Sequence, residues 1–126
     1  MADLSQSRQD YLEAILELAR ETGSVRSIDV AEKLNVSRAS VSRAVGVLKQ
    51  AGYVEQEPYG EIRLTELGRR SASRVSDNHR ILKDFLLRVL KLDADTAEAD
   101  ACRMEHSVSG DTISALEAFL KEYQSI

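Results

Sequence analysis

Three side chains with metal-binding atoms are gathered in one short stretch of the sequence. Cys102, Glu105 and His106 are spaced at i, i+3 and i+4, so a helix would place them on one face. Carboxylate donors favour manganese, whereas imidazole or thiolate donors favour iron, cobalt or zinc. The stretch therefore indicates a candidate site for a divalent transition metal ion.

Other potential donors lie far from this stretch in the sequence. Asp10 and Glu13 share one face of a predicted helix at i, i+3, and His79 is in register with the apolar stripe of another. Taken singly, the carboxylates could be a solvated face, His79 a hydrogen-bonded core histidine and Cys102 a small buried residue. Taken together, these residues favour a metal site.

The N-terminal half, which must position Asp10 and Glu13, has the pattern of a helix-turn-helix followed by a β wing. The predicted elements are a helix over about 7–21, a short helix capped by Ser27, a helix over about 38–50 capped by Ser37, and strands around 54–56 and 62–64. Thr65 is predicted to cap a helix over about 66–90 that is broken or bent near 76–78. A shorter acidic helix over about 93–107 and a last helix beginning at Asp111 or Thr112 follow.

These elements predict a mainly α protein with a small β wing. Residues 1–70 would form a winged helix-turn-helix DNA-binding domain, and residues 71–126 an all-helical metal-binding and dimerisation domain. A homodimer is expected because the second part carries more apolar surface than it can bury alone. The residues concerned are Phe85, Leu86, Val89, Leu90, Phe119, Leu120 and Tyr123.

Charge is unevenly distributed along the chain, whose net charge is -4. Residues 24–50 hold five bases against two acids, whereas residues 91–126 hold three bases against eight acids. Local sign decides which partner a surface attracts. The first segment therefore suits DNA phosphates and the second suits cations.

The helix over about 38–50 is the predicted reading helix in the major groove. Its outer face carries the small residues Ala39 and Gly46, which permit close approach, and Arg43, whose donors match guanine. The predicted DNA-binding residues are Arg26, Ser37, Arg38, Ala39, Ser40, Ser42, Arg43 and Arg63, and Lys33 and Lys49 would add sequence-independent charge.

Other functions are less compatible with the sequence. Winged helices also serve as protein-interaction modules, and a winged-helix regulator could respond to a small organic ligand or partner protein without metal. A metallohydrolase is disfavoured because the chain has no His-Glu-x-x-His motif and no nucleophile paired with a base. The single cysteine and the lack of a signal peptide or membrane-spanning run predict a cytoplasmic protein with no membrane partner.

The chain resembles the diphtheria-toxin-repressor family of iron- and manganese-dependent regulators, particularly its short manganese-transport-regulator branch. The matching segments are Asp10-Tyr11-Leu12-Glu13, Ile28 to Leu48, Leu64-Thr65-Glu66-Leu67-Gly68, His79-Arg80 with Phe85-Leu86, and Cys102-Arg103-Met104-Glu105-His106. Like family members of this length, the chain is expected to lack the extra C-terminal domain of longer iron regulators. The resemblance implies a repressor of metal-uptake genes that binds palindromic operator DNA as a dimer when loaded with Mn(II) or Fe(II).

The resemblance also implies a ligand set. Asp10, Cys102, Glu105 and His106 would surround one ion, and Glu13, His79 and Glu105 would serve a neighbouring ion, with Glu105 as a possible bridge. The manganese branch has a glutamate in place of Cys102, whereas the iron branch has cysteine there and a methionine in place of Asp10. Whether one or two ions bind, and whether Cys102 uses its sulfur or its carbonyl, stays open. The hard carboxylate of Asp10 favours manganese, with iron next, and Zn(II) or Co(II) as ions that could bind in vitro.

Overall fold

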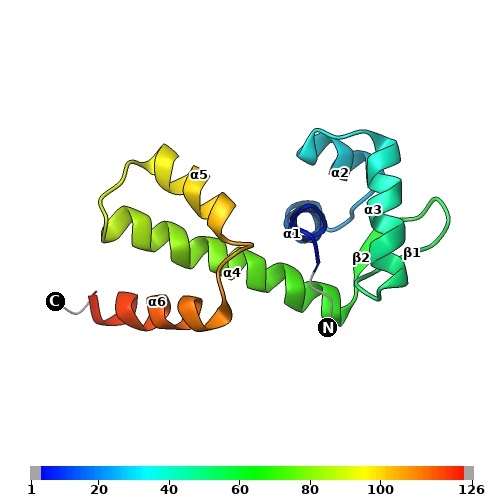
Figure 1. The fold of residues 1–126 in the computed structure, drawn as a ribbon. Helices are drawn as coiled ribbons and strands as arrows, with labels where there is room; N and C mark the ends of the chain where they lie inside the picture. The colour runs from blue at the N-terminus through cyan, green and yellow to red at the C-terminus, as the bar shows by residue number, and fades with distance from the viewer. Residues whose placement is uncertain (1–3, 124–126) are drawn as a thin grey trace. The chain divides into compact units, whose positions relative to one another are not determined.

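A computed structural model describes residues 4–123, which form six helices and a two-stranded sheet (Figure 1). The elements are α1 (Gln6–Thr22), α2 (Ser27–Leu34), α3 (Arg38–Gln50), β1 (Val54–Gln56), β2 (Ile62–Leu64), α4 (Glu66–Arg88), α5 (Ala94–Met104) and α6 (Gly110–Tyr123). They divide into two compact units, of which one ends at Ser73 and the other begins at Arg74. The predicted fold class, mainly α with a small wing, is confirmed.

The first unit contains the helix-turn-helix and the wing. Its core forms because α1 and α3 each present one apolar stripe, and both stripes are buried. The largest fully buried side chains of this core are Leu12, Ile15, Val25, Val30, Val41, Leu48, Val54 and Ile62. The outer face of α3 is left to solvent.

Local signals set the ends of the helices in this unit. Asn35 adopts a left-handed conformation, with φ 55°, in the turn between α2 and α3. The hydroxyl of Ser37 caps α3 by accepting the N–H of Ser40 at 3.1 Å, as predicted. The predicted cap at Ser27 is wrong: Ser27 is already helical, and the Asp29 carboxylate reaches back to accept the N–H of Arg26 at 3.0 Å.

The wing is an antiparallel hairpin in which Val54 pairs with Leu64. It is fastened to the segment after α1 because the Ile62 N–H donates to the Val25 carbonyl at 2.7 Å. Gly68, at the start of α4, is needed for close packing here, since a Cβ at this position would lie 2.0 Å from the carbonyl oxygen of Tyr53.

In the second unit, the last part of α4 packs with α5 and α6. Its core consists of Ile81, Leu82, Leu86, Ala97, Ala101, Ile113 and Leu120.

The long helix α4 begins in the first unit, where the hydroxyl of Thr65 caps it by accepting the Gly68 N–H at 3.1 Å, as predicted. The predicted break near 76–78 is wrong, because α4 is helical throughout these residues, whereas the alternative of a bend stays a prediction. Their weak helix propensity is overridden by packing, and the Asn78 amide donates to the Glu105 carbonyl at 3.4 Å.

The ends of α5 and α6 differ slightly from expectation. α5 ends at Met104 rather than near residue 107, but Glu105 keeps helical backbone angles and donates its N–H to Ala101 at 3.0 Å. α6 begins at Gly110, where the Ser109 hydroxyl accepts the Thr112 N–H at 3.2 Å. Within residues 4–123, no helix combines the length and the apolar character needed to cross a bilayer.

Candidate functional site

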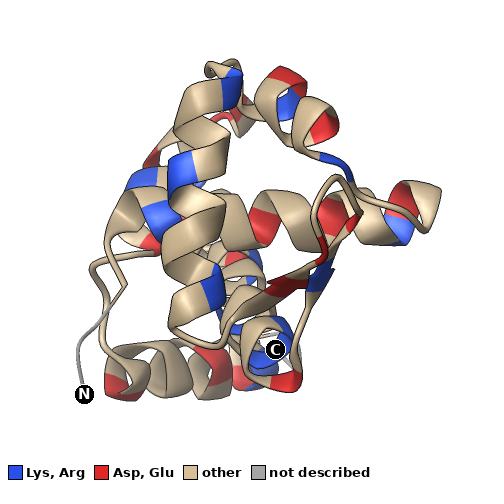
Figure 2. Cartoon of the chain, turned by 90° about the vertical axis from the view of Figure 1, so that its right-hand side faces the viewer, with Lys and Arg blue, Asp and Glu red and all other residues tan. Residues whose placement is uncertain are grey.

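The solvent-facing side of α3 has the form of a DNA-reading surface. Val41, Val45 and Leu48 are buried beneath the helix, while Ala39 and Arg43 are exposed on the other side. The helix carries three basic residues and no acidic one, and it stands upright at the front of Figure 2. This arrangement presents small side chains and a guanidinium together, as close approach to base edges requires.

Two hollows flank α3. One, of about 420 Å³, lies between the helix and the wing and is lined by the cations Arg26, Arg38 and Lys49. The other, of about 600 Å³, lies towards the start of α1 and is lined by Arg8 and Arg43 among others. A helix in the major groove has a phosphate backbone on each side, so cations in both positions suit DNA. Arg8 is an addition to the predicted set.

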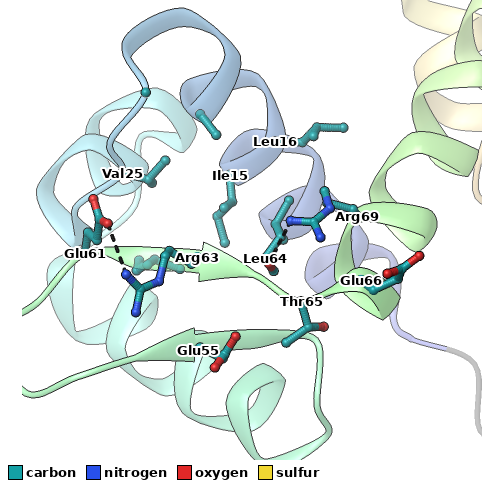
Figure 3. A pocket seen from close by; sticks show the side chains of 13 residues that line it. Ile15, Leu16, Val25, Glu55, Glu61, Arg63, Leu64, Thr65, Glu66 and Arg69 are labelled. Atoms are coloured by element: carbon teal, nitrogen blue, oxygen red, sulfur yellow. Dashed lines mark hydrogen bonds and ion pairs between the residues drawn. The ribbon is translucent and has the colours of Figure 1, made fainter.

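Two predicted cations are paired with carboxylates of the protein. The Lys33 ammonium lies 3.1 Å from the Glu17 carboxylate, which raises the pKa of Lys33 and holds the ammonium against α1. Arg63 is exposed on β2, but its guanidinium lies 3.5 Å from Glu61. Figure 3 shows Arg63 with Glu61 and Glu55 in a third hollow, of about 500 Å³, between the wing and α1. The positive charge of both residues is therefore partly neutralised.

In the second unit, side chains of the kinds that bind metal ions face one another between α4 and α5. His79 and Lys83 are one turn apart on α4, and Glu98 and Cys102 are one turn apart on α5. His79 Nε2 lies 3.1 Å from Glu98 Oε1, and the Cys102 sulfur lies 3.8 Å from His79 Nδ1. The two i, i+4 pairs thus form one polar group.

Glu105 extends this group into the interior. Its side chain is 3% exposed, its Oε2 atom lies 2.8 Å from His79 Nδ1, and its Oε1 atom lies 3.2 Å from His106 Nε2. A buried carboxylate with an imidazole beside each oxygen offers the oxygen and nitrogen donors that manganese and iron ions take. The residues present therefore fit a divalent transition metal ion.

Glu98 is a residue of this group that the sequence prediction missed. Its Oε1 atom faces both the Lys83 ammonium, at 2.9 Å, and His79. The Cys102 thiol donates to its Oε2 atom at 3.4 Å. The hydrogen bond from Lys83, and smaller contributions from His79 and Cys102, lower the pKa of Glu98 from 4.5 to about 2 despite partial burial. The i, i+4 spacing of Glu98 and Cys102 was the available signal.

The remaining predicted metal ligands, Asp10 and Glu13, lie on α1 and belong to the first unit. Both are partly buried. The other predicted ligands all belong to the second unit, so the participation of Asp10 and Glu13 in a shared centre stays a prediction.

Comparison with known proteins places both units in one family. The domain described as "Iron dependent repressor, N-terminal DNA binding domain" matches residues 3–62. The domain described as "Iron dependent repressor, metal binding and dimerisation domain" matches residues 65–125. The chain belongs to the iron-dependent repressor family, whose members are metal-dependent transcriptional regulators rather than enzymes, as the resemblance implied.

Individual relatives agree with this family assignment. An uncharacterised HTH-type transcriptional regulator of Methanocaldococcus jannaschii is 35% identical, over 96% of this chain and 98% of its own length. The transcriptional regulator MntR of Escherichia coli is 36% identical, over 90% of this chain and 73% of its own. A solved manganese-dependent transcriptional repressor in complex with manganese is 32% identical, with a TM-score of 0.80 over 90% of this chain. The chain spans about half of that structure, 52% of its length.

Proposed function

We propose that this protein is a manganese-responsive repressor, with Fe(II) as the next preferred ion, that binds a palindromic operator as a homodimer in the cytoplasm and represses metal-uptake genes. The basic outer face of α3 and its two flanking hollows support DNA binding. The choice of manganese is supported by the hard carboxylate of Asp10 and by the similarity to a manganese-dependent repressor.

The observation that carries this proposal is the burial of the Glu105 carboxylate between His79 and His106. Removing a charged group from water is costly unless strong partners compensate. A divalent ion, when bound, would add positive charge and fixed coordination beside this buried carboxylate and its two imidazole neighbours. We assign Asp10, Cys102, Glu105 and His106 as the residues that would hold it.

The proposed ligands come from both units, so a bound ion would couple metal binding to DNA binding. Asp10 lies on α1 beside Tyr11 and Leu12, which are buried in the core under the reading helix. Holding Asp10 with Glu105 and His106 would restrict the movement of the reading helix relative to the dimerising part. That restriction favours the conformation that matches DNA and raises its affinity by a population shift.

Dimerisation through the second unit is supported by its exposed apolar side chains. Leu90 is 52% exposed and Phe119 is 45% exposed. The ring of Phe119 lies 6.2 Å from that of Phe85 and 5.8 Å from that of Tyr123, which forms an aromatic surface that a second copy could cover. Two reading helices held in this way would suit the half-sites of a palindrome.

The second predicted ligand set, Glu13, His79 and Glu105, is a separate proposal. It is supported by the contact of 2.8 Å between His79 and Glu105. Counting the ions bound per chain in the wild type and in Glu13→Gln tests it. A loss of one ion in the variant would support this set, and an unchanged number would reject it.

The metal response is tested by fluorescence anisotropy with a duplex selected from a random pool. Affinity is measured with manganese, iron, zinc and a chelator, for the wild type and for Glu105→Gln. The exposed residue Glu122 provides the matched control Glu122→Gln, which removes the same charge elsewhere. We expect manganese to raise the affinity of the wild type and the control but not of Glu105→Gln. Equal affinity in metal and chelator would favour a regulator that responds to an organic ligand or partner protein instead.

A further inference from the structure

His79, Glu98 and Cys102 form a cluster of metal-binding atoms within the second unit. One nitrogen, one oxygen and one sulfur atom from these residues all lie within 4.8 Å of one another. The cluster includes Glu98, which the ligand set proposed above does not use. A thiolate and an imidazole with one carboxylate suit ions such as Zn(II) or Co(II) better than Mn(II).

A positive charge of the chain itself already lies at this cluster. The Lys83 ammonium is 2.9 Å from Glu98 Oε1, the same oxygen that faces His79 Nε2 at 3.1 Å. Lys83 is held there because it follows His79 by one helical turn and so lies on the same face of α4. An incoming ion would have to compete for the carboxylate and would then lie close to an ammonium, which repels it.

We propose that Lys83 is the resident cation of this cluster and keeps His79, Glu98 and the Cys102 sulfur from together holding a metal ion of their own. Cys102 would then serve the ion at Glu105 through its backbone carbonyl. Removing the charge of Lys83 opens the cluster to a thiolate-binding divalent ion, and the Cys102 thiol releases its proton to the buffer when it coordinates. This inference rests on the proposed function, because it concerns how many ions the same metal-responsive domain holds.

The Lys83 ammonium also explains how the domain can contain a thiol and an imidazole side by side without binding ions such as Zn(II) or Co(II) there. Cys102 is exposed, so an ion from solution can reach its sulfur. Lys83 is only partly exposed, and its ammonium contacts the Glu98 carboxylate, which lies beside that sulfur. Metal-dependent DNA binding would therefore depend only on the ion that the Glu105 carboxylate would hold.

Equilibrium dialysis of the full chain against Co(II) tests the proposal. We expect Lys83→Met to bind one more ion per chain than the wild type, with added near-ultraviolet absorption from cobalt bound to thiolate. Lys83→Arg keeps a cation and should bind the same number of ions as the wild type. Equal numbers in Lys83→Met and the wild type would overturn the proposal.

A second variant locates the added ion. Glu98→Gln in the Lys83→Met background should return the number of ions to that of the wild type, and persistence of the added ion would overturn the assignment. Circular dichroism checks folding, and Lys83→Gln replaces Lys83→Met if the latter does not fold. The proposed function fails separately, if the wild type binds no ion, because the present inference depends only on the difference between variants.

Discussion

The Oε2 atom of Glu105 lies 2.8 Å from the Nδ1 atom of His79, in a place where the carboxylate is almost wholly removed from solvent. The contact joins the turn after α5 to the middle of α4. A buried carboxylate between imidazoles is more readily explained by ion binding than by stability, since apolar residues often serve stability as well as buried ion pairs do.

Glu105→Gln should separate stability from metal binding. The carboxamide keeps the shape but removes the buried charge, so we expect the metal-free variant to be about as stable as the wild type. At a manganese concentration about 100 times its Kd, the wild type should gain about 2.7 kcal/mol in free energy of unfolding, and the variant none. Denaturation with and without manganese measures both quantities. An equal gain in the variant would remove Glu105 from the ligand set.

The pairing of Lys83 with Glu98 should appear in the pH dependence of stability. The pKa of Glu98 is lowered to about 2 in the folded protein, so its contribution is present above about pH 4.5 and is lost as the pH falls towards 2. Because Glu98 is 47% exposed, the contribution should not exceed about 1 kcal/mol.

Urea denaturation of the wild type and Lys83→Met measures this contribution. We expect the difference in their free energies of unfolding to be larger at pH 6 than at pH 3, with Lys83→Arg close to the wild type at both. A difference that grows on acidification would show that the ion pair is not its source.

Arg43 and Lys49 should contribute to DNA binding in different ways. If Arg43 contacts a base edge, Arg43→Ala should cost about 1 to 3 kcal/mol on the selected duplex and little on random DNA. Lys49 lines the hollow beside the wing, so Lys49→Ala should weaken binding to all sequences and reduce the salt slope by about 1. Anisotropy titrations at several salt concentrations distinguish the two. The same loss on both duplexes for Arg43→Ala would make it a phosphate contact.

Gly46 should favour DNA contact at the expense of helix stability. It lies within α3, and a Cβ there would meet no atom within 4 Å. Gly46→Ala should therefore stabilise the protein by about 1 kcal/mol while its methyl group weakens DNA binding. Thermal melting and anisotropy measure the two effects. A stabilised variant with unchanged DNA affinity would mean that this face of α3 does not approach the bases.

Much of the fold could be predicted because its signals are local. Ser37 and Thr65 cap α3 and α4 as expected, since the capping hydroxyl lies three residues before the N–H that it accepts. The cap of α2 was misplaced by one residue because a carboxylate at Asp29 replaced the hydroxyl expected at Ser27. The expected break in α4 is absent because packing outweighs the weak helix propensity of residues 76–78.

The site was predicted less fully because its contacts join separate helices. The i, i+3, i+4 spacing of Cys102, Glu105 and His106 was visible in the sequence, but the meeting of α4 with α5 was not. That meeting brings Lys83 and Glu98 together, from positions 15 residues apart, at 2.9 Å. A search for charged partners one helical turn from each candidate ligand would have found both.

The central claim, that metal binding and DNA binding are coupled, is tested most directly by measuring the affinity for manganese twice. Calorimetric titration is carried out on the protein alone and on the protein saturated with the selected duplex. Linkage requires DNA to raise manganese affinity by the same factor as manganese raises DNA affinity, typically about 5- to 150-fold. Agreement of the two factors is the predicted result, and a manganese affinity that DNA leaves unchanged would contradict the account.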